Sequence, residues 1–134
     1  MIKHADDEQL QGAFKLHQQE TKVHVERLEK LLKELIGKAD DKKDPIITAL
    51  ISSGVNTVRE SSSAPVRDAG MIATAQKIEH YEMASYGSAR DWAKNLGLTA
   101  HVEVLQKTLD EEKHADHLLT TISQRENVAA AAAR

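Results

Sequence analysis

Apolar residues recur at alternating spacings of three and four along most of the 134-residue chain. This spacing restricts each such segment to a helix with one buried stripe, because residues three and four apart share one face of an α-helix. Residues 7–36, 66–95 and the segment that begins at Thr99 all follow it. With only two prolines and 3% aromatic residues, the composition is typical of an all-α bundle.

Local stop and start signals divide the chain into three long helices and one short helix. Asp6 or Asp7 can cap the first helix, and Thr99 can cap the last one. Gly37 can end the first helix and Gly97 the third, and Asp44-Pro45 predicts the start of the short helix. We expect the short helix to bury a face made of Ile46, Ile47, Leu50, Ile51, Gly54, Val55 and Val58. Residues 1–128 are predicted to form one helical domain, and 129–134 an alanine-rich tail that frays.

Charge and hydropathy argue against several classes of function. The formal net charge is −3, with no basic stripe, so we predict no nucleic-acid partner. The apolar runs are only a few residues long, and residues 1–7 contain no segment typical of a signal peptide, so we expect a cytoplasmic protein with no membrane association. Without cysteine, any metal site must use oxygen and nitrogen ligands.

Acidic and imidazole side chains interrupt the apolar stripes near the middle of each long helix. The interruptions are Glu20 and His24, then Glu79 and Glu82, then Glu112 and Asp116. Carboxylates in a packed core cost several kcal/mol each unless they are neutralised. Because their five negative charges would nearly balance two divalent ions, the pattern favours a bound pair of metal ions.

Other interpretations of the same residues remain open. Glu79 and Glu82 would be solvated if Tyr81 and Met83 formed the buried face instead. His17 and His24 could each hold a carboxylate in place by a hydrogen bond rather than bind metal, and Tyr86 could do so through its hydroxyl. The charges of Arg27 and Glu111 are expected on the solvated face.

Three segments, residues 17–29, 75–87 and 109–116, resemble the YciF/YciE-type ferritin-like stress proteins of bacteria. The resemblance covers essentially the whole chain and implies a ferritin-like bundle that forms a homodimer. It also implies a site similar to the carboxylate-bridged di-iron centre of rubrerythrins. Glu20, Glu79, Glu82 and Glu112 match its metal-binding glutamates. Two positions depart from that pattern. The family's histidine is expected at position 23, where this chain has Val23 and the histidine is His24, one residue later. A second histidine is expected at position 116, where this chain has Asp116.

The resemblance also implies a further long helix before residue 1, of which residues 1–7 look like the last turn. We therefore expect a ferritin-like bundle that lacks the usual first helix, with a second copy covering the open seam. The leading functional hypothesis is a stress protein that reacts two iron or manganese ions with peroxide or oxygen. The alternative is a non-enzymatic dimeric helical stress protein whose metal site is incomplete or empty.

Overall fold

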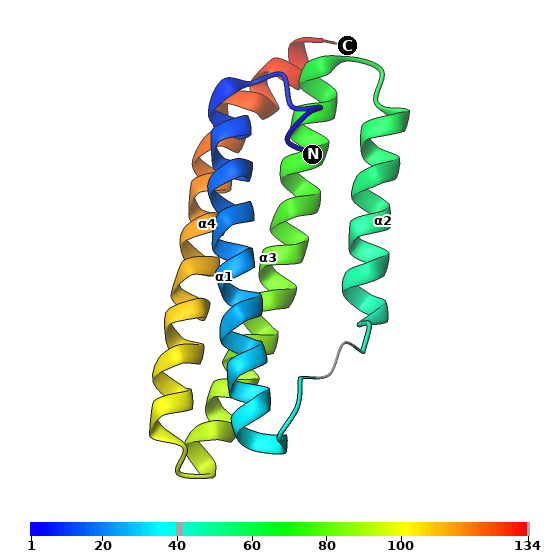
Figure 1. Ribbon diagram of the computed structural model, residues 1–134. Coiled ribbons are helices and arrows are strands. Elements are labelled where there is room, and N and C mark those ends of the chain that lie inside the picture. The colour runs from blue at the N-terminus through cyan, green and yellow to red at the C-terminus, as the bar shows by residue number, and fades with distance from the viewer. Residues whose placement is uncertain (40–41, 134) are drawn as a thin grey trace.

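The computed structural model describes residues 1–39 and 42–133, and within these ranges it contains four helices and no strand. They are α1 (Glu8–Ile36), α2 (Pro45–Glu60), α3 (Ala64–Asn95) and α4 (Thr99–Ala132), shown in Figure 1. The predicted all-α bundle of three long helices and one short helix is confirmed. No helix in the described part of the chain is long and apolar enough to cross a membrane.

Local capping explains both ends of α1 and the start of α2. The Asp7 side chain accepts a hydrogen bond from the backbone of Leu10, and Asp44 accepts two at the start of α2. Gly37 ends α1 with a φ of 78°, a left-handed conformation that glycine adopts without strain. The predicted cap at Thr99 is wrong: α4 begins there, but the residue at the cap position is Leu98, and no side chain makes a capping bond.

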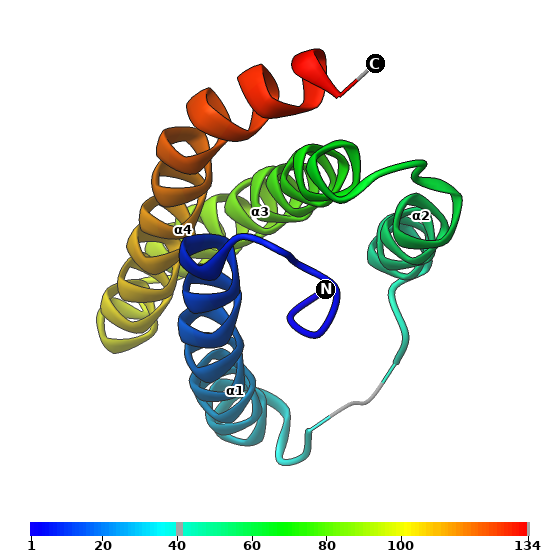
Figure 2. The same cartoon turned by 90° about the horizontal axis from the view of Figure 1, so that it is seen from above.

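The helices follow an arc in the order α1, α4, α3, α2 when seen along the bundle (Figure 2). α4 packs along α3, α1 packs against α4, and α2 packs against α3. The N-terminal segment lies between α1 and α2, at the end of the bundle where α1 begins (Figures 1 and 2). The three long helices therefore surround one interior, and α2 is attached at its side.

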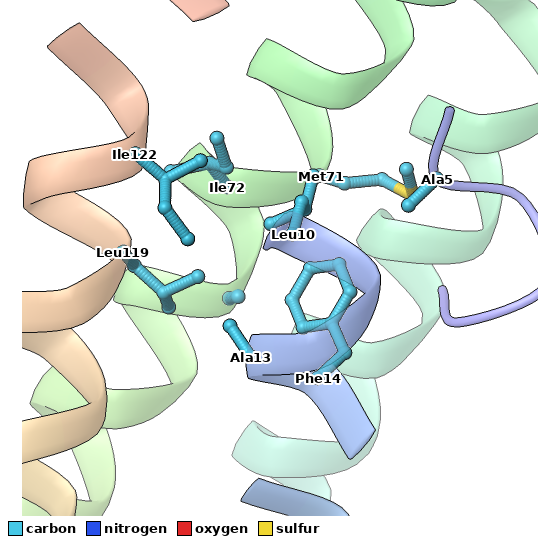
Figure 3. Packing of buried hydrophobic residues seen from close by; sticks show 9 residues of the cluster. Ala5, Leu10, Ala13, Phe14, Met71, Ile72, Leu119 and Ile122 are labelled. Carbon is cyan, nitrogen blue, oxygen red and sulfur yellow. The ribbon is translucent and has the colours of Figure 1, made fainter. Parts of the chain in front are cut away.

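The interior contains two apolar clusters at different heights. The first lies toward the N-terminal end of α1 and includes Leu10, Phe14, Met71, Ile72, Leu119 and Ile122 (Figure 3). The second is made of Leu31, Tyr86, Ala93, Leu105 and Leu109. Along α1, the positions between the two clusters are those of His17, Glu20 and His24. The polar positions of the stripes are thus enclosed between two packed layers.

Helix α2 departs from its predicted burial. Only Gly54 is buried, whereas Ile46, Ile51 and Val55 are 54%, 52% and 53% exposed. A Cβ atom at Gly54 would lie 3.1 Å from Cγ2 of Thr74 in α3, so the two helices approach closely along that one edge. Because α2 packs against no other helix to a comparable extent, the rest of its apolar face stays open.

The alanine-rich segment continues α4. The helix passes residue 128 without a break and ends at Ala132, while Val128 is exposed. The separation of a domain 1–128 from a tail 129–134 therefore stays a prediction. Asp40, Asp41 and Arg134 lie outside the described residues.

Candidate metal centre

Four side chains from three helices converge between the two apolar clusters. His17 of α1, Glu79 and Glu82 of α3, and Glu112 of α4 each offer one ligand atom, and these atoms all lie within 4.8 Å of one another. Glu79 and Glu112 are buried, and His17 and Glu82 are partly buried. Three of the predicted acids are therefore brought together, and the alternative that Glu79 is solvated is wrong. His17, which we expected behind the ligands, is a member of the cluster.

Several polar atoms of this cluster are buried without a hydrogen-bond partner. Among the described residues they include both carboxylate oxygens of Glu112, Oε2 of Glu79 and Nδ1 of His17. Within the cluster, His17 Nε2 lies 3.3 Å from Glu79 Oε1, and His17 Nδ1 lies 3.8 Å from Glu112 Oε2. Buried polar groups are nearly always satisfied. Convergent unsatisfied oxygen and nitrogen atoms are the donor set that a hard or borderline cation requires.

Burial and crowding change the acidity of these groups. Burial raises the pKa of Glu79 far above its usual range, and the neighbouring Glu112 carboxylate adds to the effect. Burial and the charge of Glu112 raise the pKa of Glu82 to about 7. Burial lowers the pKa of His17, against the opposing charges of Glu112 and Glu20. Without a cation, the centre therefore favours protonated carboxyl groups and a neutral His17 imidazole.

His24 lies at the edge of the cluster and contacts two carboxylates from α4. Its ring is buried, with Nε2 2.8 Å from Glu111 Oε2 and Nδ1 2.9 Å from Glu112 Oε1. The second contact lacks the geometry of a hydrogen bond, so Nδ1 has no hydrogen-bond partner. Burial lowers the pKa of His24, but the contacts with Glu112 and Glu111 outweigh it and the pKa is raised. The ring of Tyr86 meets that of His24 edge-on, with centroids 6.1 Å apart.

The other two predicted ligands lie further out. Glu20 is partly exposed, with Oε2 4.0 Å from His17 Nδ1. Asp116 lies outside the cluster: its Oδ1 accepts a hydrogen bond from Gln76 at 3.2 Å and lies 3.4 Å from Nδ1 of His80. Four residues advance a helix by about 6 Å and about 40° beyond a full turn, which is enough to turn a short aspartate away from the level of Glu112.

Comparison with known proteins identifies the relatives of this chain. Residues 1–133 match the family model described as "Domain of unknown function (DUF892)". The chain belongs to the DUF892 family. Within this group, it is 36% identical to protein YciF of Escherichia coli K12 over 118 residues, which are 87% of this chain and 71% of YciF. The resemblance to YciF-type proteins is therefore confirmed.

Two solved structures agree with the fold of this DUF892 chain. The crystal structure of the E. coli stress protein YciF matches with a TM-score of 0.86 and 32% identity, over 93% of this chain and 79% of that one. YcfI from Rhodopseudomonas palustris, a proposed structural protein, matches with a TM-score of 0.86 and 37% identity, over 90% of this chain and 76% of that one. The helical bundle is thus shared with these proteins.

The DUF892 chain holds a charged pair beside the cluster that we had placed on the solvated face. Arg27 donates two hydrogen bonds to the carboxylate of Glu111, from Nη1 to Oε2 and from Nη2 to Oε1 at 3.1 Å. Arg27 Nη1 also donates to the hydroxyl of the buried Thr108 at 3.0 Å. Both charged side chains are partly buried, with 18% and 24% of their surface exposed, and they are paired with each other rather than placed on the fully solvated face that we predicted. The missed signal is the i,i+3 spacing from His24 to Arg27 and from Thr108 to Glu111.

A small cavity adjoins the cluster on the side of α1. Its volume is about 10 Å³, and its lining includes His17, Glu20 and Glu79 together with apolar residues such as Phe14 and Leu119. A cavity of this size is close to the minimum for one water molecule. A molecule of two or three atoms could reach the cluster here only with small movements of the lining.

Proposed function

We propose that this DUF892 chain is a cytoplasmic stress-response protein that holds a pair of iron or manganese ions and reacts them with peroxide or oxygen. The observation that carries the proposal is the set of buried, unsatisfied oxygen and nitrogen atoms of His17, Glu79 and Glu112. Apolar layers lie on both sides of these atoms along the bundle. Nothing but protons or cations can neutralise carboxylates that are so placed.

Each residue of the centre has a role in this proposal. His17, Glu79, Glu82 and Glu112 hold the ions, and Glu20 and His24 complete the set from its edges. Asp116 holds Gln76 and is not assigned as a ligand. Bound iron or manganese would supply the redox electrons for reducing the oxidant. The small cavity beside His17, Glu20 and Glu79 admits only a compact molecule, which favours peroxide or oxygen over larger substrates.

Metal content and thermal stability test the proposal. Protein purified without chelator is expected to contain iron or manganese near stoichiometric amounts by elemental analysis. Glu79→Ala should remove most of it, whereas Glu103→Ala, which removes the same charge from an exposed site on α4, should not. Wild-type protein with less than a tenth of an equivalent of either metal, after incubation with both, would contradict the proposal.

The second candidate is a non-enzymatic helical stress protein whose centre stays without metal. The raised pKa values of Glu79, Glu82 and His24 favour it, because protons on the carboxyl groups and an imidazolium at His24 could neutralise the acids. The relative YcfI, a proposed structural protein, is in keeping with it. Under this alternative, added Mn²⁺ or Fe²⁺ leaves the melting temperature of chelator-treated protein unchanged, whereas the leading proposal requires it to rise.

We also propose that two copies of the chain associate through the exposed apolar face of α2. Ile51 and Val55, four residues apart, form this face, and monomeric proteins rarely leave a large apolar patch uncovered. Sedimentation of the wild type should give a dimer, and Ile51→Lys with Val55→Lys should give a monomer. The matched pair Ser52→Lys and Asn56→Lys changes exposed polar positions of the same helix and should leave the dimer intact.

A further inference from the structure

His24 is held between two carboxylates that have different surroundings. Glu112 has both oxygens buried without a hydrogen bond and belongs to the proposed metal centre. Glu111 is one residue earlier on α4, and its two oxygens accept a bidentate pair of hydrogen bonds from Arg27. The ring of His24 therefore has one nitrogen directed at the centre and the other directed at a neutralised ion pair.

The hydrogen bond between His24 and Glu111 determines where the ring carries its proton. A carboxylate whose oxygens are both engaged by a guanidinium acts only as an acceptor, so the 2.8 Å contact requires a proton on Nε2 of His24. A metal ion binds the neutral ring, in which the lone pair then lies on Nδ1, in competition with the proton that the neighbouring carboxylates favour. Nδ1 is 2.9 Å from Glu112 Oε1 and has no hydrogen-bond partner, so its lone pair faces the atoms of the centre.

Arg27 fixes Glu111 in turn. The guanidinium binds the carboxylate in a planar fork and is itself held by the hydroxyl of the buried Thr108. Glu111 therefore cannot rotate away from His24 without breaking two charge-assisted hydrogen bonds. The chain of contacts runs from α4 to α1 and back to α4, which restricts the position of the imidazole as well as its tautomer.

We propose that Glu111, anchored by Arg27, is a positioning residue that orients His24 so that Nδ1 binds the metal ion beside Glu112. This inference rests on the proposed function, and it goes beyond it by assigning roles to two residues outside the ligand set. A metal-bound histidine whose other nitrogen donates to a carboxylate is a general arrangement, and loss of that partner typically costs about 10- to 100-fold in metal affinity.

Pulsed electron paramagnetic resonance on protein loaded with less than one equivalent of Mn²⁺ tests the inference. The wild type should show nitrogen couplings from His17 and His24, and His24→Gln should remove the part that His17→Gln leaves. Glu111→Ala should weaken Mn²⁺ binding by about 10- to 100-fold and change or remove the same coupling. Glu111→Gln retains an acceptor oxygen for Nε2, so it should weaken binding by less than about tenfold and keep the coupling. Glu103→Ala is the matched control and should match the wild type.

The possible results separate this inference from the proposal on which it rests. If the wild type binds Mn²⁺ but His24→Gln leaves its nitrogen couplings unchanged, or if Glu111→Ala matches Glu103→Ala, only the inference fails. If the wild type binds neither Mn²⁺ nor iron, the proposed function fails and the inference fails with it. Circular dichroism checks that each variant keeps its helix content, and Glu111→Gln decides the matter should Glu111→Ala not fold.

Discussion

Nε2 of His17 and Oε1 of Glu79 lie 3.3 Å apart, and this contact joins α1 to α3 across the interior of the bundle. On one side of it lies the apolar cluster around Phe14 and Met71, and on the other that around Leu31 and Leu105. A polar contact between such layers is strong only if its charges are neutralised. The stability of the bundle should therefore depend on pH and on cations in ways that a purely apolar core would not.

The first prediction concerns Glu82 in chelator-treated protein. Its pKa is raised by burial to about 7 in the folded state, against a usual value of 4.5, so the folded state binds the extra proton. The resulting stabilisation is complete below pH 4.5 and is lost as the pH rises through 7. Glu82→Gln cannot ionise, so it should be more stable than the wild type by about 1–3 kcal/mol at pH 8 and nearly equal at pH 5.

Urea denaturation at the two pH values measures this difference. Glu103→Gln is the control, because that side chain is exposed and its replacement should change the free energy of unfolding by no more than about 0.5 kcal/mol at either pH. An equal effect of Glu82→Gln at pH 5 and pH 8 would show that Glu82 ionises as it does in the unfolded chain.

The second prediction concerns the pH dependence of metal binding. Ions compete with the protons on Glu79 and Glu82, whose pKa values are both raised by burial, so binding should release protons at neutral pH. Below pH 7, each proton that the ion displaces should lower the apparent affinity for Mn²⁺ by about tenfold per pH unit. Isothermal titration calorimetry in two buffers of different ionisation enthalpy counts the released protons. Binding without proton release would place the ion at some other group of residues.

The third prediction uses two glycines of α3 in different surroundings. A Cβ atom at Gly70 would lie 2.5 Å from Cγ2 of Thr57 in α2, whereas one at Gly87 meets nothing within 4 Å. Gly87→Ala should therefore raise the free energy of unfolding by about 0.5–1 kcal/mol through helix propensity alone. Gly70→Ala should lower it by about 1–3 kcal/mol, because α2 must move away from α3. Stabilisation by both substitutions would mean that the contact between α2 and α3 is loose.

The features that follow from local chemistry were predictable from the sequence. Asp7, Gly37 and Asp44 mark helix ends through bonds to residues next to them, and Glu79 and Glu112 are placed inside by the apolar residues on either side. These arguments need only one helix at a time.

The features that were missed depend on how the helices are placed relative to one another. The open face of α2 reflects packing against α3 alone, which the periodicity of α2 does not contain. The inclusion of His17 and the exclusion of Asp116 depend on the rotation of α1 and α4 about their own axes. Arg27 and Glu111 lie at the edges of their stripes, where the spacing predicts a solvated face and only the opposite helix makes them a pair.

The fourth prediction concerns Asp68, a buried residue of α3 that holds the start of α1. Its Oδ2 accepts hydrogen bonds from the backbone of Asp6 at 2.8 Å and of Asp7 at 2.9 Å. Asp68→Ala leaves both donors without this acceptor and should lower the free energy of unfolding by about 1–3 kcal/mol. Asp68→Asn keeps one acceptor oxygen and should cost less than Asp68→Ala, while the exposed Asp91→Ala serves as the control. Amide hydrogen exchange should also show faster exchange at Asp6 and Asp7 in Asp68→Ala, and unchanged exchange there would mean that other groups hold this end of α1.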